Sequence, residues 1–260
     1  MHASGKVVVV TGASMGIGEA IAGTFAREGA TVVWSSRVMS RSQAALQRSG
    51  FEQSGVAAAC DVRDPEQIER LVSDSVARFG RLDVWVNNAG HGIKDSIERV
   101  DMDLCRATFE TNFFGALRAM QLVIPAMRRQ GSGAIINISS VAGHIPLVFS
   151  GVYSATKFAM DAAGKAARVE LRRAGINVLT VSPGYVATNF GENTLCGHEV
   201  RMRRPESIRG ISPERVARAT FEGWRKGKRE VVVPWSMIPA IKLYQLFPWM
   251  IEYAMARMTK

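Results

Sequence analysis

Short apolar segments alternate with longer amphipathic segments along most of this chain, and that alternation limits the folds open to it. Residues 7–10 are apolar throughout, as in strands that are buried on both faces. Strands that alternate with helices form βαβ units, in which helices cover both faces of a parallel sheet. The sequence therefore predicts an α/β fold with a doubly wound, mainly parallel sheet of about seven strands. The expected strands are residues 7–10, 31–35, 56–60, 82–86, 134–138, 177–181 and 231–233, and the expected helices are residues 17–28, 65–79, 102–129 and 153–173.

One domain accounts for most of the chain. Hydrophobic residues make up 47% and charged residues 22% of the sequence, which is the balance of a folded protein and argues against long disorder. No linker and no fixed-period repeat interrupts the alternating pattern. We therefore expect a single domain over residues 1–235 and an apolar, aromatic-rich C-terminal extension over residues 236–260.

The cysteines and the N-terminus indicate a reducing compartment. Cys60, Cys105 and Cys196 are odd in number and widely spaced, so they predict neither a disulfide framework nor a zinc site. The apolar run at residues 7–10 is too short for a signal peptide and continues directly into a glycine-rich loop. We therefore expect a cytoplasmic protein without a metal site.

The net charge of +10 is concentrated near the C-terminus. Residues 201–230 hold ten basic and four acidic side chains, whereas residues 1–200 are nearly neutral. Nucleic-acid binding is not expected, because it usually spreads a basic stripe over the fold. A basic segment beside an apolar one instead suits an anionic partner, such as a membrane surface contacted peripherally through residues 201–260. The alternatives are a solvated basic segment and an extension that packs within the protein or against a neighbouring subunit.

A glycine-rich loop joins the first expected strand to the first expected helix. Residues 11–18 have the spacing G-x-x-x-G-x-G at Gly12, Gly16 and Gly18. Glycines let the chain turn tightly and let a pyrophosphate approach the backbone, and a helix N-terminus offers free N–H groups. The loop therefore indicates a dinucleotide site, although a structural turn could use the same glycines.

The end of the second expected strand bears on the choice of cofactor. An acidic residue at this place usually holds the ribose hydroxyls of NAD(H). Residues 34–37 include none, and Arg37 could bind a 2′-phosphate with a further hydrogen bond from Ser36. NADP(H) is therefore predicted in preference to NAD(H), unless Arg37 is only a solvated loop cation.

Tyr153 and Lys157 lie four residues apart, so they share one face of the expected helix. A phenol with its usual pKa of about 10 is a poor base at neutral pH, and a neighbouring ammonium would lower that pKa. Ser140 follows a strand, which places its hydroxyl at the carboxyl edge of the sheet, where open α/β folds bind ligands. Together these three residues suggest an acid–base site.

Taken in order, these motifs resemble those of the short-chain dehydrogenase/reductases over about residues 5–190. Residues 11–18 match the family's T-G-x-x-x-G-x-G, and residues 87–90 match its N-N-A-G. The resemblance implies a Rossmann-type fold, an oxidoreductase that uses a nicotinamide cofactor, and a homodimer or homotetramer. The catalytic residues that it implies are Asn112, Ser140, Tyr153 and Lys157.

The resemblance also implies how these residues take part in hydride transfer between the nicotinamide and a carbonyl or secondary alcohol carbon. Tyr153 would exchange a proton with the substrate oxygen, and Ser140 would hydrogen-bond that oxygen. Lys157 would hold the nicotinamide ribose and lower the pKa of Tyr153, and Asn112 would position a water that links Lys157 to solvent. The expected cofactor contacts are Gly12, Ser14, Met15, Gly16, Ile17, Gly18, Ser36, Arg37, Asp61, Val62, Asn88, Ala89, Gly90, Tyr153, Lys157, Pro183, Gly184, Val186 and Thr188.

The substrate is indicated by less specific features. By resemblance, residues 189–211 form the substrate lid. The aromatic extension could close the pocket over an apolar molecule, so a lipid- or steroid-like ketone is the hypothesis.

The sequence departs from the family pattern at Met15, where many NADP(H)-dependent members carry a basic residue. The rival hypothesis is a non-catalytic nucleotide-binding or scaffold protein on the same fold, which would have no chemical need for the complete tetrad.

Overall fold

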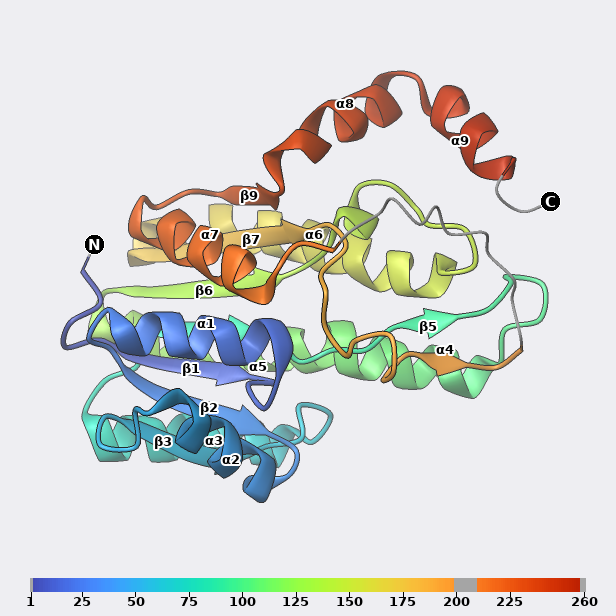
Figure 1. Ribbon diagram of the computed structural model, residues 1–260. Coiled ribbons are helices and arrows are strands. Elements are labelled where there is room, and N and C mark those ends of the chain that lie inside the picture. Colours follow the sequence, from blue (N-terminus) through green and yellow to red (C-terminus); the bar gives the residue numbers. More distant parts are fainter. Residues whose placement is uncertain (1, 199–209, 258–260) are drawn as a thin grey trace.

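Seven parallel strands form the sheet at the centre of the molecule (Figure 1). The computed structural model describes residues 2–198 and 210–257. Neighbouring strands follow the order β3-β2-β1-β4-β6-β7-β9, and every pair is parallel. Each strand expected from the sequence is present with small shifts at its ends, so the predicted fold class is confirmed. The strands are β1 (Val7–Thr11), β2 (Thr31–Ser36), β3 (Gly55–Ala59), β4 (Val84–Asn87), β6 (Gly133–Ile138), β7 (Ile176–Pro183) and β9 (Glu230–Val233).

Helices cover both faces of this sheet, which is why both faces of its central strands are rich in apolar residues. In β1, Val8 and Val10 pack into the core on one face, and Val9 packs into the core on the other. Both cores are therefore built from alternate residues of the same strands. One helical layer is α1 (Gly16–Arg27), α2 (Met39–Ser49) and α7 (Pro213–Arg225), and the other is α3 (Pro65–Phe79), α5 (Gly115–Gln130) and α6 (Gly151–Glu170).

The sequence pattern does not predict α2, because most residues of this helix are polar. Only Ser42, Ala45 and Leu46 are buried in it, so the apolar residues are too few to show a helical period. Short 3-10 turns, which the pattern also does not reveal, lie at Val141–Gly143 and Arg172–Ala174. The position of α2 matters below, because one of its side chains reaches the glycine-rich loop.

The long helix expected over residues 102–129 is present but divided. α4 (Met102–Phe109) and α5 are joined by a π-helical turn at Glu110–Phe114. Such turns are rare and occur frequently at functional sites. Asn112 lies within this turn and is buried.

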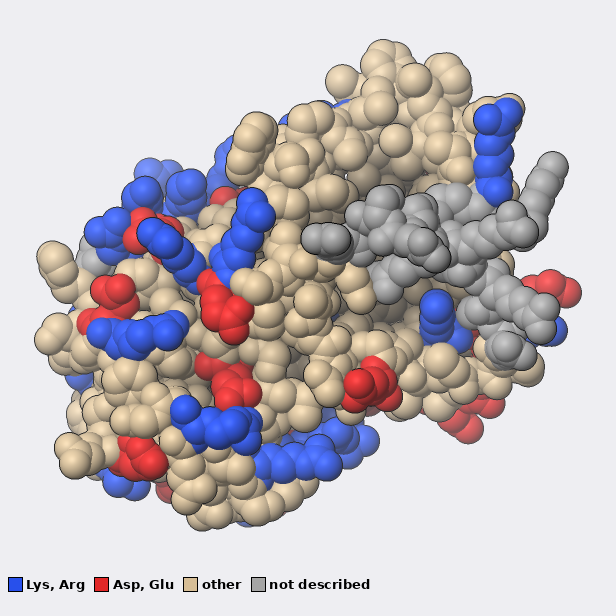
Figure 2. Space-filling model, in the orientation of Figure 1, with Lys and Arg blue, Asp and Glu red and all other residues tan. Residues whose placement is uncertain are grey.

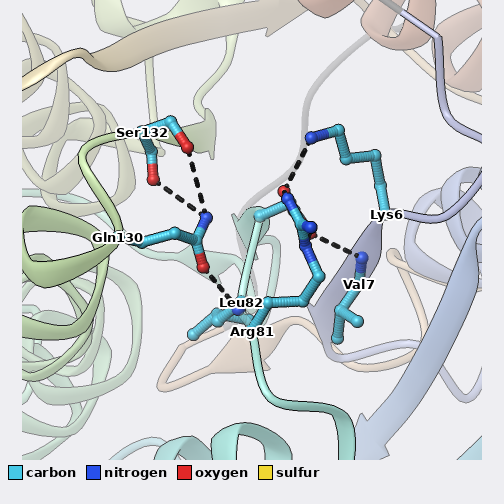
Figure 3. Close-up of polar contacts among 7 residues, drawn as sticks. Lys6, Val7, Arg81, Leu82, Gln130 and Ser132 are labelled. Atoms are coloured by element: carbon cyan, nitrogen blue, oxygen red, sulfur yellow. Dashed lines mark hydrogen bonds and ion pairs between the residues drawn. The ribbon is translucent and has the colours of Figure 1, made fainter.

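A buried carboxylate ties together the amino ends of β1 and β4 (Figure 3). Asp83 accepts hydrogen bonds from Lys6 Nζ at 2.9 Å, from the Val7 N–H at 3.0 Å and from two nitrogens of Arg81 at 2.6 Å. Burial pushes the pKa of Asp83 upward, but the hydrogen bonds from Arg81, Val7 and Lys6 outweigh it and hold this pKa below its usual value. This end of the sheet therefore contributes to stability, and the predicted site lies at the opposite end.

The C-terminal extension stands apart from the sheet layers. After a 3-10 turn at Trp235–Met237, the chain forms α8 (Ile238–Leu246) and α9 (Pro248–Ala256). Figure 1 shows these two helices as an arch that rises from β9. Ile241 is the one buried residue of the two helices, and it packs in a small cluster with Val141. In the described part of the chain, no helix combines the length and the apolar character that crossing a bilayer requires.

Candidate active site

The carboxyl ends of the central strands meet at one edge of the sheet, and the predicted site residues follow these ends. The glycine-rich loop follows β1, and Asn88 follows β4. Ser140 is the second residue after β6, and Pro183 is the last residue of β7. Because these parallel strands are neighbours, residues from four separate parts of the chain come together at this edge.

The glycine-rich loop lies tightly against the segment after β4. Asn88 Nδ2 donates to the carbonyls of Thr11 at 2.9 Å and Gly12 at 3.1 Å. Gly12 has a φ of +65°, and a Cβ there would lie 2.9 Å from Ala89 Cα. Glycine is therefore required at Gly12 by both backbone conformation and space. The predicted contacts Asn88 and Ala89 shape the loop that would receive a phosphate.

The N-terminus of α1 is open to an anion. Its N-cap residue, Met15, makes no side-chain hydrogen bond to the first turn, so the N–H groups there are not capped by a side chain. The next residues, Gly16, Ile17 and Gly18, begin the helix, and Gly16 has a φ of +60°. A Cβ at Gly16 would lie 3.3 Å from Thr188 Cγ2, so the loop after β7 borders the same place. These features fit the pyrophosphate of a dinucleotide.

The end of β2 differs in part from the expectation. Arg37 is exposed, as a residue that binds a 2′-phosphate should be. The Ser36 hydroxyl is buried and lies 2.8 Å from Ser42 Oγ and 3.0 Å from the Val38 carbonyl, so it already has protein partners. Arg48 of α2, which sequence reasoning missed, donates to the Ser14 carbonyl in the glycine-rich loop at 3.1 Å. The only signal for Arg48 in the sequence was a basic residue in the segment that follows the second strand.

The predicted adenine contacts follow β3. Asp61 forms an ion pair with Arg63 at 2.6 Å, and this hydrogen-bonded guanidinium lowers the pKa of the Asp61 carboxyl. Val62 is buried beside Gly115, where a Cβ would meet the Val62 side chain at 3.1 Å. Both residues lie at the carboxyl edge, and the charge of Asp61 is balanced within the protein.

Tyr153 and Lys157 lie on the same face of α6, as their spacing predicts. Lys157 Nζ lies 5.7 Å from the centre of the Tyr153 ring and donates to the Ile138 carbonyl at 2.9 Å. Lys157 is buried, and Tyr153 is partly buried. Ser140 stands at the end of β6, close enough to Tyr153 to influence its pKa. The structure therefore brings these three predicted residues together.

The expected lowering of the Tyr153 pKa is wrong for this structure. Burial raises the pKa of Tyr153 to about 12, and the hydrogen bond from Ser140 offsets only part of this effect. Burial also lowers the pKa of Lys157 to about 8, although the Asp161 carboxylate opposes that change. Burial is the larger effect on the Tyr153 phenol, and the Lys157 ammonium is directed at the Ile138 carbonyl. Tyr153 therefore holds its proton at neutral pH.

Asn112, in the π turn, connects the segment after β4 to α6. Its Nδ2 donates to the His91 carbonyl at 2.8 Å and to Thr156 Oγ1 at 3.3 Å, and its Oδ1 accepts from the His91 N–H at 3.0 Å. Gly90 allows this contact, because a Cβ there would lie 3.0 Å from Asn112 Oδ1. The Asn112 side chain is thus tied to Thr156, which directly precedes Lys157 in α6.

The segment after β7 approaches both the catalytic residues and the loop. Ser140 Oγ donates to the Pro183 carbonyl at 3.4 Å, and the Gly184 N–H donates to the Val233 carbonyl at 2.7 Å. Val186 pairs with Ile211 in an isolated parallel bridge. The predicted contacts Pro183, Gly184 and Val186 are therefore held in place by neighbouring main chain.

Part of the predicted lid lies over the site. Phe190 packs edge-on against Tyr153, with ring centres 5.8 Å apart. Asn193 Nδ2 lies 3.9 Å from Met15 Sδ of the glycine-rich loop. Two short strands, β5 (Ile93–Lys94) and β8 (Leu195–Cys196), pair beside it. Residues 199–209 of the expected lid lie outside the described residues.

A doubly wound sheet, a glycine-rich loop at a helix N-terminus and a Tyr–Lys pair at the carboxyl edge define a dinucleotide-dependent oxidoreductase. A family model described as short chain dehydrogenase matches residues 6–196. The chain therefore belongs to the short-chain dehydrogenase/reductase family, and it is an oxidoreductase with a nicotinamide cofactor.

Named relatives and solved structures agree with this assignment. The chain is 36% identical to ketoacyl reductase HetN of Nostoc sp. over 88% of its own length and 79% of that protein. It is 32% identical to dehydrogenase/reductase SDR family member 7B of Bos taurus over 92% of its length and 76% of that protein. A short-chain dehydrogenase from Streptomyces avermitilis has a TM-score of 0.83 and 29% identity, with 97% of both chains covered. A family structure from Burkholderia phymatum in complex with NAD has a TM-score of 0.84 at 22% identity, covers 96% of both chains, and shows the same fold.

Proposed function

We propose that this protein reduces the carbonyl group of an apolar, lipid- or steroid-like ketone with NADPH, and that Tyr153 is the proton donor. The observation that carries the proposal is the position and protonation of Tyr153. Its phenol stands at the carboxyl edge of the sheet between Ser140 and Lys157, and burial keeps it protonated. A protonated group that can hydrogen-bond a carbonyl oxygen is suited to give it a proton as negative charge develops there.

The other catalytic residues assist that proton transfer. Ser140 would donate a hydrogen bond to the substrate oxygen and so stabilise its developing charge. At neutral pH Lys157 is still mostly an ammonium, because its pKa of about 8 lies above 7. This cation favours the phenolate that Tyr153 becomes after giving up its proton. Asn112 holds the backbone around His91 and so keeps the floor of the site in place.

The basic groups near the end of β2 support NADPH as the cofactor. When bound, the reduced nicotinamide would supply the hydride. Arg37 is exposed at the end of β2, where no acidic side chain stands to repel a 2′-phosphate. Arg48 brings a second guanidinium to the rim of the loop, where it donates to the Ser14 carbonyl and pairs with Glu19 at 3.0 Å. Because guanidinium groups bind phosphate oxygens in pairs of hydrogen bonds, this arrangement favours the phosphorylated cofactor.

Apolar side chains at Tyr153 and at the start of its helix support an apolar substrate. Phe190 covers one side of the tyrosine ring. The segment from Pro146 to Phe149, just before α6, lines a mostly apolar cavity of about 400 Å³ together with Ile97, and Ser96 and Glu252 also line it. HetN is named a ketoacyl reductase, and a ketoacyl group is a carbonyl on a hydrocarbon chain. The same class of substrate suits this chain.

A substrate panel with each cofactor tests the proposal. Purified protein is mixed with NADPH or NADH and with short polar, aromatic and long-chain ketones, and loss of reduced-nicotinamide absorbance is followed. We expect long-chain ketones and NADPH to give the highest kcat/KM. Tyr153→Phe should lose activity while NADPH still binds, as measured by fluorescence, and Tyr253→Phe on the exposed C-terminal helix should behave as the unaltered protein. Equal turnover of polar and long-chain ketones would contradict the substrate class.

Cofactor choice has a separate test. Arg37→Ala should raise the KM for NADPH by about tenfold, the loss of one charge-assisted contact, and leave the KM for NADH unchanged. Arg106→Ala on exposed α4 is the control for loss of a surface cation. Equal KM values for NADPH and NADH in the unaltered protein would refute the NADPH preference.

A further inference from the structure

The bend between α8 and α9 exposes a run of apolar side chains to solvent. Residues 245–250 are all exposed, and five of these six are apolar. Leu246 is 71% exposed and Trp249 is 65% exposed, whereas large apolar side chains are normally buried. We call residues 246–250 the apolar tip. Figure 1 shows the bend between α8 and α9 at the top of the arch, away from the sheet.

The apolar tip lies at the bend between the two helices, within an uncharged stretch of the chain. Residues 243–251 contain no charged side chain, and in the two helices together Lys242 and Glu252 are the only charged residues. A flat protein surface would cover one side of such a projection and leave the others in water. A lipid bilayer surrounds an inserted projection, so it removes all of these side chains from water at once.

Basic and aromatic side chains surround the base of the tip. Lys242 lies on α8, Arg257 follows α9, and Arg229, which precedes β9, lines a cavity together with Lys242. Figure 2 shows the top of the arch free of charged side chains on the face drawn, with blue side chains at its ends. Lys and Arg near a membrane surface are attracted to anionic headgroups, and Trp and Tyr favour the interface itself. Trp235 is exposed at the base of the arch in this way.

From these observations we infer that the apolar tip inserts into the surface of a bilayer that contains anionic lipids. Each nine-residue helix is about 14 Å long, which is less than half the thickness of a hydrocarbon core of about 30 Å. The arch therefore enters one leaflet and does not cross it. The basic residues at its base contact the headgroups while the sheet domain stays in water.

A cavity beneath the arch gives this insertion a use. The cavity of about 400 Å³ is lined on one side by Tyr244 of α8 and by Glu252 and Met255 of α9. On the other side it is lined by Leu147 and by Gly151, the first residue of α6, two positions before Tyr153. A hydrocarbon chain that leaves the bilayer at the arch can enter this cavity, whose wall at Gly151 belongs to the same helix that carries Tyr153. This second part of the inference rests on the proposed reduction of an apolar ketone.

Vesicle binding tests the insertion without any reaction. Full-length protein is sedimented with vesicles of phosphatidylcholine alone and of phosphatidylcholine mixed with phosphatidylglycerol. We expect binding to the mixed vesicles that weakens as salt is added. The double variant Leu246→Ser/Trp249→Ser should bind at least about tenfold more weakly, because the side chains that enter the lipid are lost. Val169→Ser removes an apolar side chain that is 77% exposed on α6 and should bind unchanged.

Two further measurements separate this inference from its rivals. In the first, light scattering compares the oligomeric state of the double variant with that of the unaltered protein. If the double variant were a monomer where the unaltered protein is an oligomer, and the unaltered protein bound neither kind of vesicle, the apolar tip would contact a second copy of the chain. That result would overturn the inference. The double variant should reduce a short water-soluble ketone at the normal rate but a long-chain ketone in mixed vesicles several-fold more slowly. Normal turnover without vesicle binding refutes the insertion alone. Vesicle binding without turnover of any ketone refutes the proposed function and leaves the insertion standing.

Discussion

Gly18 offers the sharpest test of how the glycine-rich loop is built. Gly18 and Gly23 both lie in α1, so alanine at either position gains about the same 1 kcal/mol of helix propensity. A Cβ at Gly18 would come within 3.0 Å of the Gly12 carbonyl oxygen and of Asn88 Nδ2, whereas a Cβ at Gly23 has no neighbour within 4 Å. Forcing extra volume into a packed site costs about 1–3 kcal/mol. The difference between the two variants therefore isolates the cost of that contact.

We expect Gly23→Ala to be more stable than the unaltered protein by up to about 1 kcal/mol, and Gly18→Ala to be less stable than Gly23→Ala by about 1–3 kcal/mol. Urea denaturation followed by circular dichroism measures both values. Gly18→Ala should also weaken NADPH binding, because the displaced side chain of Asn88 holds the Thr11 and Gly12 carbonyls in place. If Gly18→Ala matched Gly23→Ala in both stability and binding, this account of the loop would be wrong.

Three other predictions concern charge and assembly. Asp83→Asn should lower the free energy of unfolding by about 2 kcal/mol near neutral pH, because it loses buried charge-assisted hydrogen bonds, while exposed Asp103→Asn should change little. Since the folded-state pKa of Asp83 is low, its stabilising effect should disappear as the pH falls through that value in an acid titration of unfolding. Lys157→Met should abolish activity yet raise stability at pH 7 by about 2 kcal/mol, because relief of about 3 kcal/mol of burial cost exceeds the loss of the bond to Ile138. That gain should shrink as the pH rises from about 8 toward 10.5, where the buried amine is neutral anyway, and a constant gain across this range in urea titrations would contradict it. A homodimer or homotetramer also stays a prediction, and light scattering that shows a monomer at every concentration would exclude it.

Local sequence pattern was sufficient for the frame of the site. Apolar runs such as residues 7–10 mark strands buried on both faces, and the spacing of Gly12, Gly16 and Gly18 marks a loop that must turn tightly at a helix N-terminus. The four-residue spacing of Tyr153 and Lys157 places both on one face of α6 wherever that helix packs. These features depend on residues close together in the sequence, so no tertiary information is needed to recognise them.

Other features depend on which distant residues pack together, and only the folded structure decided them. The pKa of Tyr153 rises because neighbouring segments bury it, although its nearest cation in sequence alone suggests the opposite direction. The hydroxyl of Ser36 is taken up by Ser42, and Arg48 reaches the glycine-rich loop, because the polar helix α2 folds back over β2 and β3. Burial and partner choice are properties of the packed chain, whereas the periodicity and spacing that identify strands, turns and helix faces are already present before the chain folds.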